Sequence, residues 1–250
     1  MAGDAVPDAI PAATLIVVRD RTNGAPELLM VERSEGMAFA AGALVFPGGR
    51  IDAADVVVAA SSGASAAAVA AIRETIEETA VAAGLSPSSG PDRGRMLQSA
   101  LVEGRPFAEL LEGSGLALDP GALVPFARWV PKFHAVRRFD TMFFVARCPP
   151  GEWQPEVIAG ECASAAWVTA AEVLERERLG QARLIFPTRR TLERLAQHGS
   201  FDAIRADAAA YPVRPITPWV EEREGTRFIT IPADAGYPVT EERLDGLWRG

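Results

Sequence analysis

The chain has 250 residues, of which 48% are hydrophobic and 23% are charged. These values are ordinary for a globular protein long enough to bury a large core, and they exclude wholesale disorder. The formal net charge of −8 disfavours nucleic-acid binding, because an acidic surface repels the phosphates of DNA and RNA.

Few residues are available for disulfides or for soft metal sites. Cys148 and Cys162 fit no zinc-binding spacing, and two cysteines do not make a disulfide framework in a chain of this length. The only histidines are His134 and His198, which leaves little material for a histidine-rich metal site or a Ser-His-Asp triad. Any bound metal is therefore expected to use hard oxygen ligands.

The N-terminal segment carries no targeting signal that we recognise. It has no basic region before its short apolar run, which argues against a signal peptide. No window reaches about 18 uninterrupted apolar residues, so we expect no membrane span. A cytoplasmic protein is the simplest interpretation.

The first half of the chain begins with a predicted hairpin. Residues 13–19 and 27–33 are expected to be strands, joined by a turn at Asn23-Gly24. A short apolar run, residues 43–47, ends at a glycine pair that we interpret as a strand-breaking loop. Residues 53–65 are expected to be a loop or an extra helical turn.

A long helix is predicted to follow, over residues 66–83 with Gly84 as its C-cap. Residues 85–92 are expected to be a loop. Residues 93–112 look helical with an interruption at Pro106, and this stretch is interpreted as a helical insertion that covers one face of the core.

The second half alternates strands and helices. Further strands are expected at residues 126–130, 139–147 and 164–168, with helices at 170–178 (capped by Thr169) and 188–197, and a strand pair within 213–231. The order is not strictly β-α-β, and no linker or repeat divides the chain. We therefore expect an α/β sandwich with a mixed central sheet, a single domain over 1–250. The insertion spans about 85–125 and the C-terminal strand extension about 213–250. The C-terminal strands could pair between two copies and form a homodimer.

The helix at 66–83 carries a cluster of acidic residues. At about 100° per residue, Glu74, Glu77 and Glu78 share an arc of about 100°, while Val69 and Ile76 fall on the opposite side. A solvated acidic face is the ordinary interpretation of such a pattern. However, Glu74 and Glu78 are like charges four residues apart, which costs roughly 0.2–0.5 kcal/mol. A divalent cation would remove that repulsion.

The glycine pair and the acidic helix together resemble the Nudix box, G-x5-E-x7-R-E-U-x-E-E-x-G-U. Matching positions are Gly49, Arg73, Glu74, Glu77, Glu78 and Val81. The chain departs from the box in three places. Asp55 stands where the family has glutamate, residues 56–72 stand where the family usually has seven residues, and Ala80 replaces the late glycine. The ten extra residues are expected to bulge out as a loop, and Ala80 to need only a helical backbone.

The resemblance extends beyond the box, over roughly residues 12–200. AFAAGALVFPGGRIDAAD, RRFDTMFFVA and FPTRRTLERLA resemble the branch of Nudix hydrolases associated with coenzyme A and acyl-CoA. This implies hydrolysis of a diphosphate bond to 4′-phosphopantetheine, or its acyl form, and 3′,5′-ADP. The alternatives are ADP-ribose, a dinucleotide or another nucleoside diphosphate derivative as substrate, a nucleotide sensor without activity, and an α/β domain whose acidic helix is merely solvated.

The resemblance also implies roles for individual residues. Mg²⁺ or Mn²⁺ would be held by Glu74 and Glu78, with Glu77 sharing the cluster and the Gly49 carbonyl completing the set. Arg73 would orient a neighbouring carboxylate, or form a plain surface ion pair with Glu77. The general base stays open between Glu74 and Glu161, and an ordinary charge at a strand edge is the alternative for Glu161.

Arginines near the box are candidates for phosphate contacts, because a guanidinium group matches phosphate geometry. They are Arg33, Arg50, Arg137 and Arg138. Arg50 is preferred because it adjoins the glycine pair. A plain surface position is the alternative interpretation for the other three.

Overall fold

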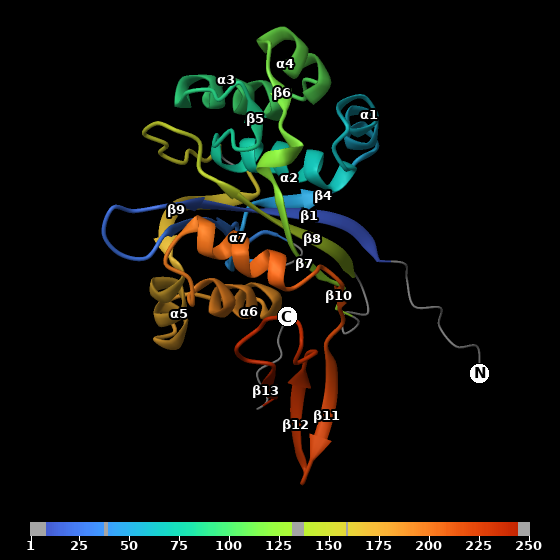
Figure 1. Ribbon diagram of the computed structural model, residues 1–250, viewed down its shortest axis with the longest axis vertical. Helices are drawn as coiled ribbons and strands as arrows, with labels where there is room; N and C mark the ends of the chain where they lie inside the picture. The colour runs from blue at the N-terminus through green and yellow to red at the C-terminus, as the bar shows by residue number, and fades with distance from the viewer. Residues whose placement is uncertain (1–8, 38–39, 132–137, 159, 245–250) are drawn as a thin grey trace, which may run out of the picture.

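The fold is an α/β/α sandwich in the computed structural model, which describes residues 9–37, 40–131, 138–158 and 160–244 (Figure 1). The predictions for Arg137 and His134 concern residues outside these ranges. Two helical layers enclose a mixed sheet. One layer holds α1 (Ala53–Ser62), α2 (Ala66–Thr79), α3 (Pro91–Val102) and α4 (Phe107–Ser114), and the other holds α5 (Ala170–Arg178), α6 (Phe186–Leu195) and α7 (Phe201–Ala210).

The central sheet has eight strands in the order β10-β7-β8-β1-β2-β3, with β4 paired to β1 and β9 paired to β2. Their bounds are β1 (Ile10–Arg19), β2 (Glu27–Arg33), β3 (Leu44–Val45), β4 (Gly48–Arg50), β7 (Val124–Trp129), β8 (Phe139–Arg147), β9 (Cys162–Thr169) and β10 (Pro215–Ile216). Strand β1 is parallel to β8 and antiparallel to β2. The expected α/β class with a mixed sheet is confirmed.

Strand β1 lies at the centre of the fold, which explains its unbroken apolar run. Leu15 and Val17 point into the core shared with α2, whereas Ile16 and Val18 point into the core shared with α6. A strand buried on both faces carries apolar residues at every position instead of at alternate ones. The other predicted strands and the predicted hairpin are also confirmed.

The glycine pair does not form a loop, contrary to the expectation. Gly48 and Gly49 belong to strand β4, where they lie opposite Thr14 and Ala13 of β1. A Cβ atom at Gly48 would overlap the carbonyl oxygen of Ala13. The glycines are therefore needed for close approach of two strands, and a sequence pattern alone does not distinguish that need from a turn.

The extra residues of the box do not bulge out as a loop. They form the ten-residue helix α1, and the expectation of a loop was wrong. The Asp55 carboxylate accepts a hydrogen bond from the Asp52 amide at 2.8 Å, which secures the first turn. The helix ends at Gly63 in the left-handed conformation, and Val58 packs into the core beside α2.

Helix α2 is shorter than expected, because it ends at Thr79. The capping residue is Ala80 with φ of 61°, so the expectation that this position needs only a helical backbone was wrong, as was the assignment of Gly84 as the C-cap. A left-handed residue is normally glycine, and its absence here concealed the helix end. At the other end, Ser65 accepts a hydrogen bond from the Ala68 amide at 3.1 Å.

The helical insertion consists of α3 and α4, with the predicted break at Pro106, which begins α4. The loop expected at residues 85–92 contains a short strand. This strand, β5 (Leu85–Ser86), pairs with β6 (Ala117–Leu118) and closes the insertion at its base, and a 3₁₀ turn follows at Pro120–Ala122.

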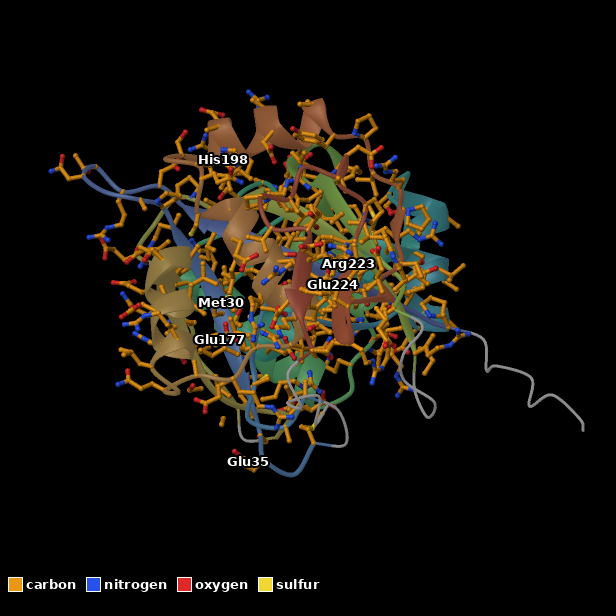
Figure 2. All side chains as sticks on the ribbon, turned by 90° about the horizontal axis from the view of Figure 1, so that it is seen from below. Met30, Glu35, Glu177, His198, Arg223 and Glu224 are labelled. Atoms are coloured by element: carbon orange, nitrogen blue, oxygen red, sulfur yellow. The ribbon has the colours of Figure 1, made fainter. Side chains whose placement is uncertain are left out.

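The opposite layer contains one helix that the sequence did not predict, α7. Ser200 caps it by accepting a hydrogen bond from the Ala203 amide at 3.2 Å. Beyond it, β11 (Trp219–Arg223), β12 (Thr226–Thr230) and β13 (Glu241–Arg243) form a separate three-stranded sheet, which contains the predicted strand pair. Figure 2 looks onto this sheet, with Arg223 and Glu224 labelled at its hairpin turn.

Across residues 9–244, apart from the short gaps, no single helix is long and apolar enough to cross a membrane. Only the pair of α1 and α2 passes a test of length and composition, and that pair is bent by 114°.

Candidate active site

A cavity of about 850 Å³ lies beside the acidic end of α2. Its walls come from β1, β4, the loops that follow β2 and precede β9, and the start of α6. Glu74, Glu77 and Glu78 all line it, together with Gly48 and Gly49. The acids of α2 therefore face a concave cavity and strand β4, the glycine strand, rather than a convex solvated surface, which argues against a merely solvated helix.

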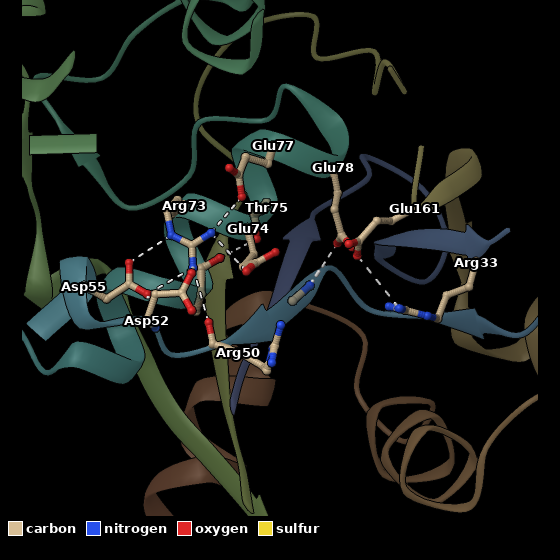
Figure 3. A network of polar contacts seen from close by, with 12 residues as sticks. Arg33, Arg50, Asp52, Asp55, Arg73, Glu74, Thr75, Glu77, Glu78 and Glu161 are labelled. Carbon is tan, nitrogen blue, oxygen red and sulfur yellow. Dashed lines mark hydrogen bonds and ion pairs between the residues drawn. The ribbon is translucent and has the colours of Figure 1, made fainter. Parts of the chain in front are cut away.

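Arg73 is the centre of a buried network of charges (Figure 3). Its guanidinium donates from Nε to Asp55 Oδ1 at 2.9 Å and from Nη2 to Asp55 Oδ2 at 3.0 Å. Nη1 donates to Glu77 Oε2 at 2.7 Å and lies 3.0 Å from Glu74 Oε1. Burial alone would lower the pKa of Arg73, but the hydrogen bond to Asp55 and the surrounding carboxylates raise it overall.

Asp55 serves this network rather than the cavity. Its side chain is 1% exposed, both oxygens pair with Arg73, and it caps α1. Asp55 is not among the described residues that line the cavity, so its carboxylate is not placed to bind a cation there. Instead, it anchors the inserted helix to the arginine that orients the acids.

Glu74 lies against the glycine strand. A Cβ atom at Gly49 would overlap the Glu74 carboxylate, so a larger residue there would displace the carboxylate from this position. Burial raises the pKa of Glu74 to about 8; Arg73 opposes the shift, and the negative charges of Glu78 and Glu77 add to it. At neutral pH the side chain thus holds a proton that a cation could displace.

Glu78 is the most buried of the three acids that α2 contributes to the cavity. Its Oε2 accepts a hydrogen bond from the Gly48 amide at 3.0 Å, and its Oε1 accepts one from the Cys162 thiol at 3.4 Å. Burial raises the pKa of Glu78 to about 7, although both hydrogen bonds oppose the shift. Burial also raises the pKa of Glu77, while its ion pair with Arg73 lowers it.

Glu161 reaches the same cavity from the loop before β9 (Figure 3). Its side chain is 69% exposed and lies 3.9 Å from Arg33 Nη2. The negative charge of Glu161 contributes to the raised pKa of Glu78. The structure thus brings together Glu161, Arg33 and the acids of α2, which are far apart in the sequence.

Of the four arginines proposed for phosphate contacts, the structure describes Arg33, Arg50 and Arg138, and these differ in their position relative to the cavity. Arg33 and Arg50 line it, whereas Arg138 is not among its described lining residues. The main chain of Arg138 holds the sheet together, because its carbonyl accepts a hydrogen bond from the Ile10 amide at 2.7 Å. Arg50 is exposed, and its carbonyl accepts from Arg73 at 3.2 Å.

Two residues of this region were not anticipated from the sequence. Cys162 contacts Glu78, and nothing in the sequence around this single thiol signals that role. Gln98 of α3 is 2% exposed, and its amide nitrogen donates to the carbonyls of Glu77 at 3.0 Å and Glu156 at 2.7 Å. It therefore links the insertion, the acidic helix and the loop that leads to Glu161.

Comparison with known proteins gave matches among solved structures only. No protein-family model and no curated protein matches the chain. The crystal structure of a Nudix hydrolase from Alicyclobacillus acidocaldarius is similar with a TM-score of 0.70 and 30% sequence identity, covering 81% of this chain and 97% of that one.

Two more distant structures are also similar to the chain. One is the Nudix domain of Shewanella oneidensis NrtR in complex with ADP ribose, with 14% identity, a TM-score of 0.45 and coverage of 76% of this chain and 88% of that one. The other is the MutT protein of Methanosarcina mazei Go1, with 16% identity, a TM-score of 0.43 and coverage of 76% and 94%.

The similarity at 30% identity spans nearly the whole of the Alicyclobacillus protein, and it agrees with the glycine strand and acidic helix described above. The chain therefore belongs to the Nudix hydrolases, enzymes that act on phosphorus-containing anhydrides.

Proposed function

We propose that the chain is a metal-dependent diphosphatase that cleaves coenzyme A or acyl-CoA to 4′-phosphopantetheine, or its acyl form, and 3′,5′-ADP. The observation that carries this proposal is the pair of buried carboxylates, Glu74 and Glu78, facing one cavity with raised pKa values. Buried acids that repel each other are costly to the fold, and such groups gather where chemistry requires them.

The donor atoms in this cavity fit a divalent cation, which Nudix hydrolases generally use. Carboxylate oxygens and a backbone carbonyl are the ligands that Mg²⁺ and Mn²⁺ prefer. Among the described residues, no three Asp, Glu, His or Cys side chains are placed so that together they could hold a metal ion. Glu74 and Glu78 would hold the ion, with Glu77 and the Gly49 carbonyl beside them, and Arg73 would keep Glu74 and Glu77 in place.

The reaction is the attack of water on one phosphorus of the diphosphate. A bound cation would neutralise the phosphate oxygens and lower the pKa of a water molecule. The chain itself would supply the base that removes the proton from the attacking water, either Glu74 or Glu161. Arg50 would bind a phosphate group, because its guanidinium is exposed at the cavity wall beside the glycine strand.

The walls of the cavity suit a ligand with both charged and apolar parts. Away from the acids, the lining is apolar and aromatic, and it includes Trp129, Phe139, Phe143, Ile185 and Pro187. Coenzyme A has a diphosphate joined to an uncharged pantetheine arm, which would lie along such a wall. We also propose that residues 1–250 act as a single domain, with the insertion at 85–125 shaping the cavity, and that the C-terminal strands pair in a homodimer.

A substrate panel tests the proposed function. The purified protein with Mg²⁺ or Mn²⁺ is given coenzyme A, acyl-CoA, ADP-ribose and NADH, and the products are identified by mass spectrometry. We expect 3′,5′-ADP from the first two, with a kcat/KM at least about tenfold above that for the others, a difference of roughly 1.4 kcal/mol. Release of AMP from ADP-ribose or NADH at a higher kcat/KM would support the alternative substrate class.

Metal binding is expected to depend on pH because cations and protons compete for the same carboxylates. The pKa of Glu74 is raised from 4.5 to about 8 and that of Glu78 to about 7, so the folded protein holds protons that the unfolded chain loses. The metal-free protein should therefore lose stability as the pH rises from about 4.5 to about 8. A cation binds best once those protons are gone.

Thermal unfolding measures this competition. The increase in Tm caused by Mg²⁺, relative to EDTA, should grow between pH 6 and pH 8.5, by several degrees in all. Calorimetry in buffers of different ionisation enthalpy should detect protons released on binding. A magnesium-induced shift in Tm that stays constant across this pH range would contradict the prediction.

A further inference from the structure

Cys162 occupies an unusual place at the end of the strand pair formed by β2 and β9. The pairing is regular from Glu27 to Glu32, where Glu32 lies opposite Ser164, and then shifts so that Arg33 lies opposite Cys162. One residue of β9 is therefore skipped. Such a bulge re-aims a side chain, and bulges are frequent beside active sites. Here Cys162 is 5% exposed and lines the cavity.

The re-aimed thiol completes the hydrogen bonding of one carboxylate. Glu78 has two oxygens, and each accepts from one donor, the Gly48 amide at 3.0 Å and the Cys162 thiol at 3.4 Å. The two donors come from β4 and β9 and approach from different strands. They fix the plane of the carboxylate, while each oxygen keeps a second lone pair for a cation.

A thiol suits this position because it is a small, uncharged hydrogen-bond donor in a residue that is only 5% exposed. A neutral donor that orients a metal ligand acts in the same way as the outer hydrogen-bond partners of other metal sites.

We propose that Cys162 is a positioning residue, whose thiol holds the Glu78 carboxylate in the orientation that binds the divalent cation. The inference rests on the proposed function, in which Glu78 is a metal ligand. The inference assigns to Cys162 no contact with the substrate and no redox chemistry. The thiol of Cys162 affects the affinity for the metal ion, and it affects the rate of hydrolysis only through that affinity.

The test compares variants with and without a donor at this position. Cys162→Ala and Cys162→Val remove the donor, and valine retains most of the volume and suits a strand. Cys162→Ser restores a donor. Cys148→Ala is the matched control, because the Cys148 thiol donates to the carbonyl of Pro149 at 3.5 Å and Cys148 is not among the described residues that line the cavity.

Mn²⁺ binding to the substrate-free protein is measured by calorimetry, after circular dichroism has shown that each variant is folded. We expect Mn²⁺ to bind about three- to tenfold more weakly to the alanine and valine variants. The serine and Cys148→Ala variants should stay within about twofold of the native protein. In the hydrolysis assay, the metal concentration for half-activation should rise by the same factor, with kcat at saturating metal nearly unchanged.

The outcomes separate this inference from the proposed function. Native affinity in a folded Cys162→Ala or Cys162→Val variant would overturn the role of Cys162. An equal loss in the serine variant would also overturn it, because volume rather than hydrogen bonding would then matter. Native affinity in Glu78→Gln would instead overturn the metal role of Glu78, and with it the proposed function.

Discussion

Replacing Glu78 by glutamine is expected to lower kcat/KM at least about a thousandfold, a loss of roughly 4 kcal/mol of transition-state stabilisation. The reason is that the amide removes a negative charge from the buried pair of acids while keeping the shape of the side chain. Glutamine can still accept one of the two hydrogen bonds now made by the Gly48 amide and the Cys162 thiol. The fold should therefore persist, and the metal-free variant should be at least as stable as the native protein at pH 8.

Steady-state hydrolysis over a range of Mg²⁺ concentrations checks this result, together with thermal unfolding in EDTA. Glu112→Gln is a suitable control, because Glu112 is exposed on α4 and does not line the cavity. It removes the same charge without touching the site and should keep native kinetics. A Glu78→Gln enzyme within about threefold of the native rate would show that the cation does not depend on this carboxylate.

Replacing Arg73 by methionine is expected to destabilise the fold by about 3–5 kcal/mol, because it leaves buried carboxylates without their partner. Asp55 would lose both bonds to the guanidinium. Glu74 and Glu77 would lose the positive charge of the guanidinium that lies beside them. Urea unfolding in EDTA measures the loss. Arg93→Met is the control, since the Arg93 side chain is exposed and its guanidinium donates to the carbonyl of Ser114 rather than to a carboxylate, and it should change stability by less than about 0.5 kcal/mol.

A double-mutant cycle with Asp55→Asn tests whether Arg73 stabilises the fold through its bonds to Asp55. If Arg73 stabilises the inserted helix through Asp55, the double variant should lose clearly less than the sum of the two single variants. Saturating Mg²⁺ should return part of the stability lost in Arg73→Met, because a cation near Glu74 replaces some of the missing positive charge. A loss below about 1 kcal/mol in Arg73→Met, or strict additivity, would contradict this role.

The elements that the sequence predicted well are those with strong local patterns. The hairpin of β1 and β2 has two apolar runs around an Asn-Gly turn, and Thr169 marks the start of α5 as its N-cap. The acidic helix was recognised because its charges follow a helical period. These features depend on residues that are close together in the sequence, so a local sequence pattern is enough to predict them.

The features that were mispredicted depend on contacts far along the chain. Helix α1 has three consecutive valines, which favour strands, and it becomes helical because Asp55 caps it and pairs with Arg73, 18 positions later. The glycine strand is fixed by its approach to β1. Ala80 adopts a conformation that the sequence signals only when glycine is present.

The residues of the candidate site also divide into those that a local pattern predicts and those that only distant contacts define. The acids of α2 could be identified from their spacing, whereas Cys162 and Gln98 could not, because both act only through hydrogen bonds to residues that are distant in the sequence. Asp55 could be aligned with the family motif, but the alignment did not reveal its two bonds to Arg73, which lies 18 positions later.

Surface insertions are ordinarily dispensable, because a loop can be shortened at little entropic cost. The α3 insertion is different, since the Gln98 side-chain amide donates to the carbonyl of Glu77 in α2 and to that of Glu156 in the loop before β9. Gly94 lets the helix backbone approach the carbonyl of Ala80, where α2 ends. Excising the segment would leave the first two carbonyls without this donor and would uncover the end of α2. Natural variation of this enzyme should therefore reshape the segment without ever deleting it.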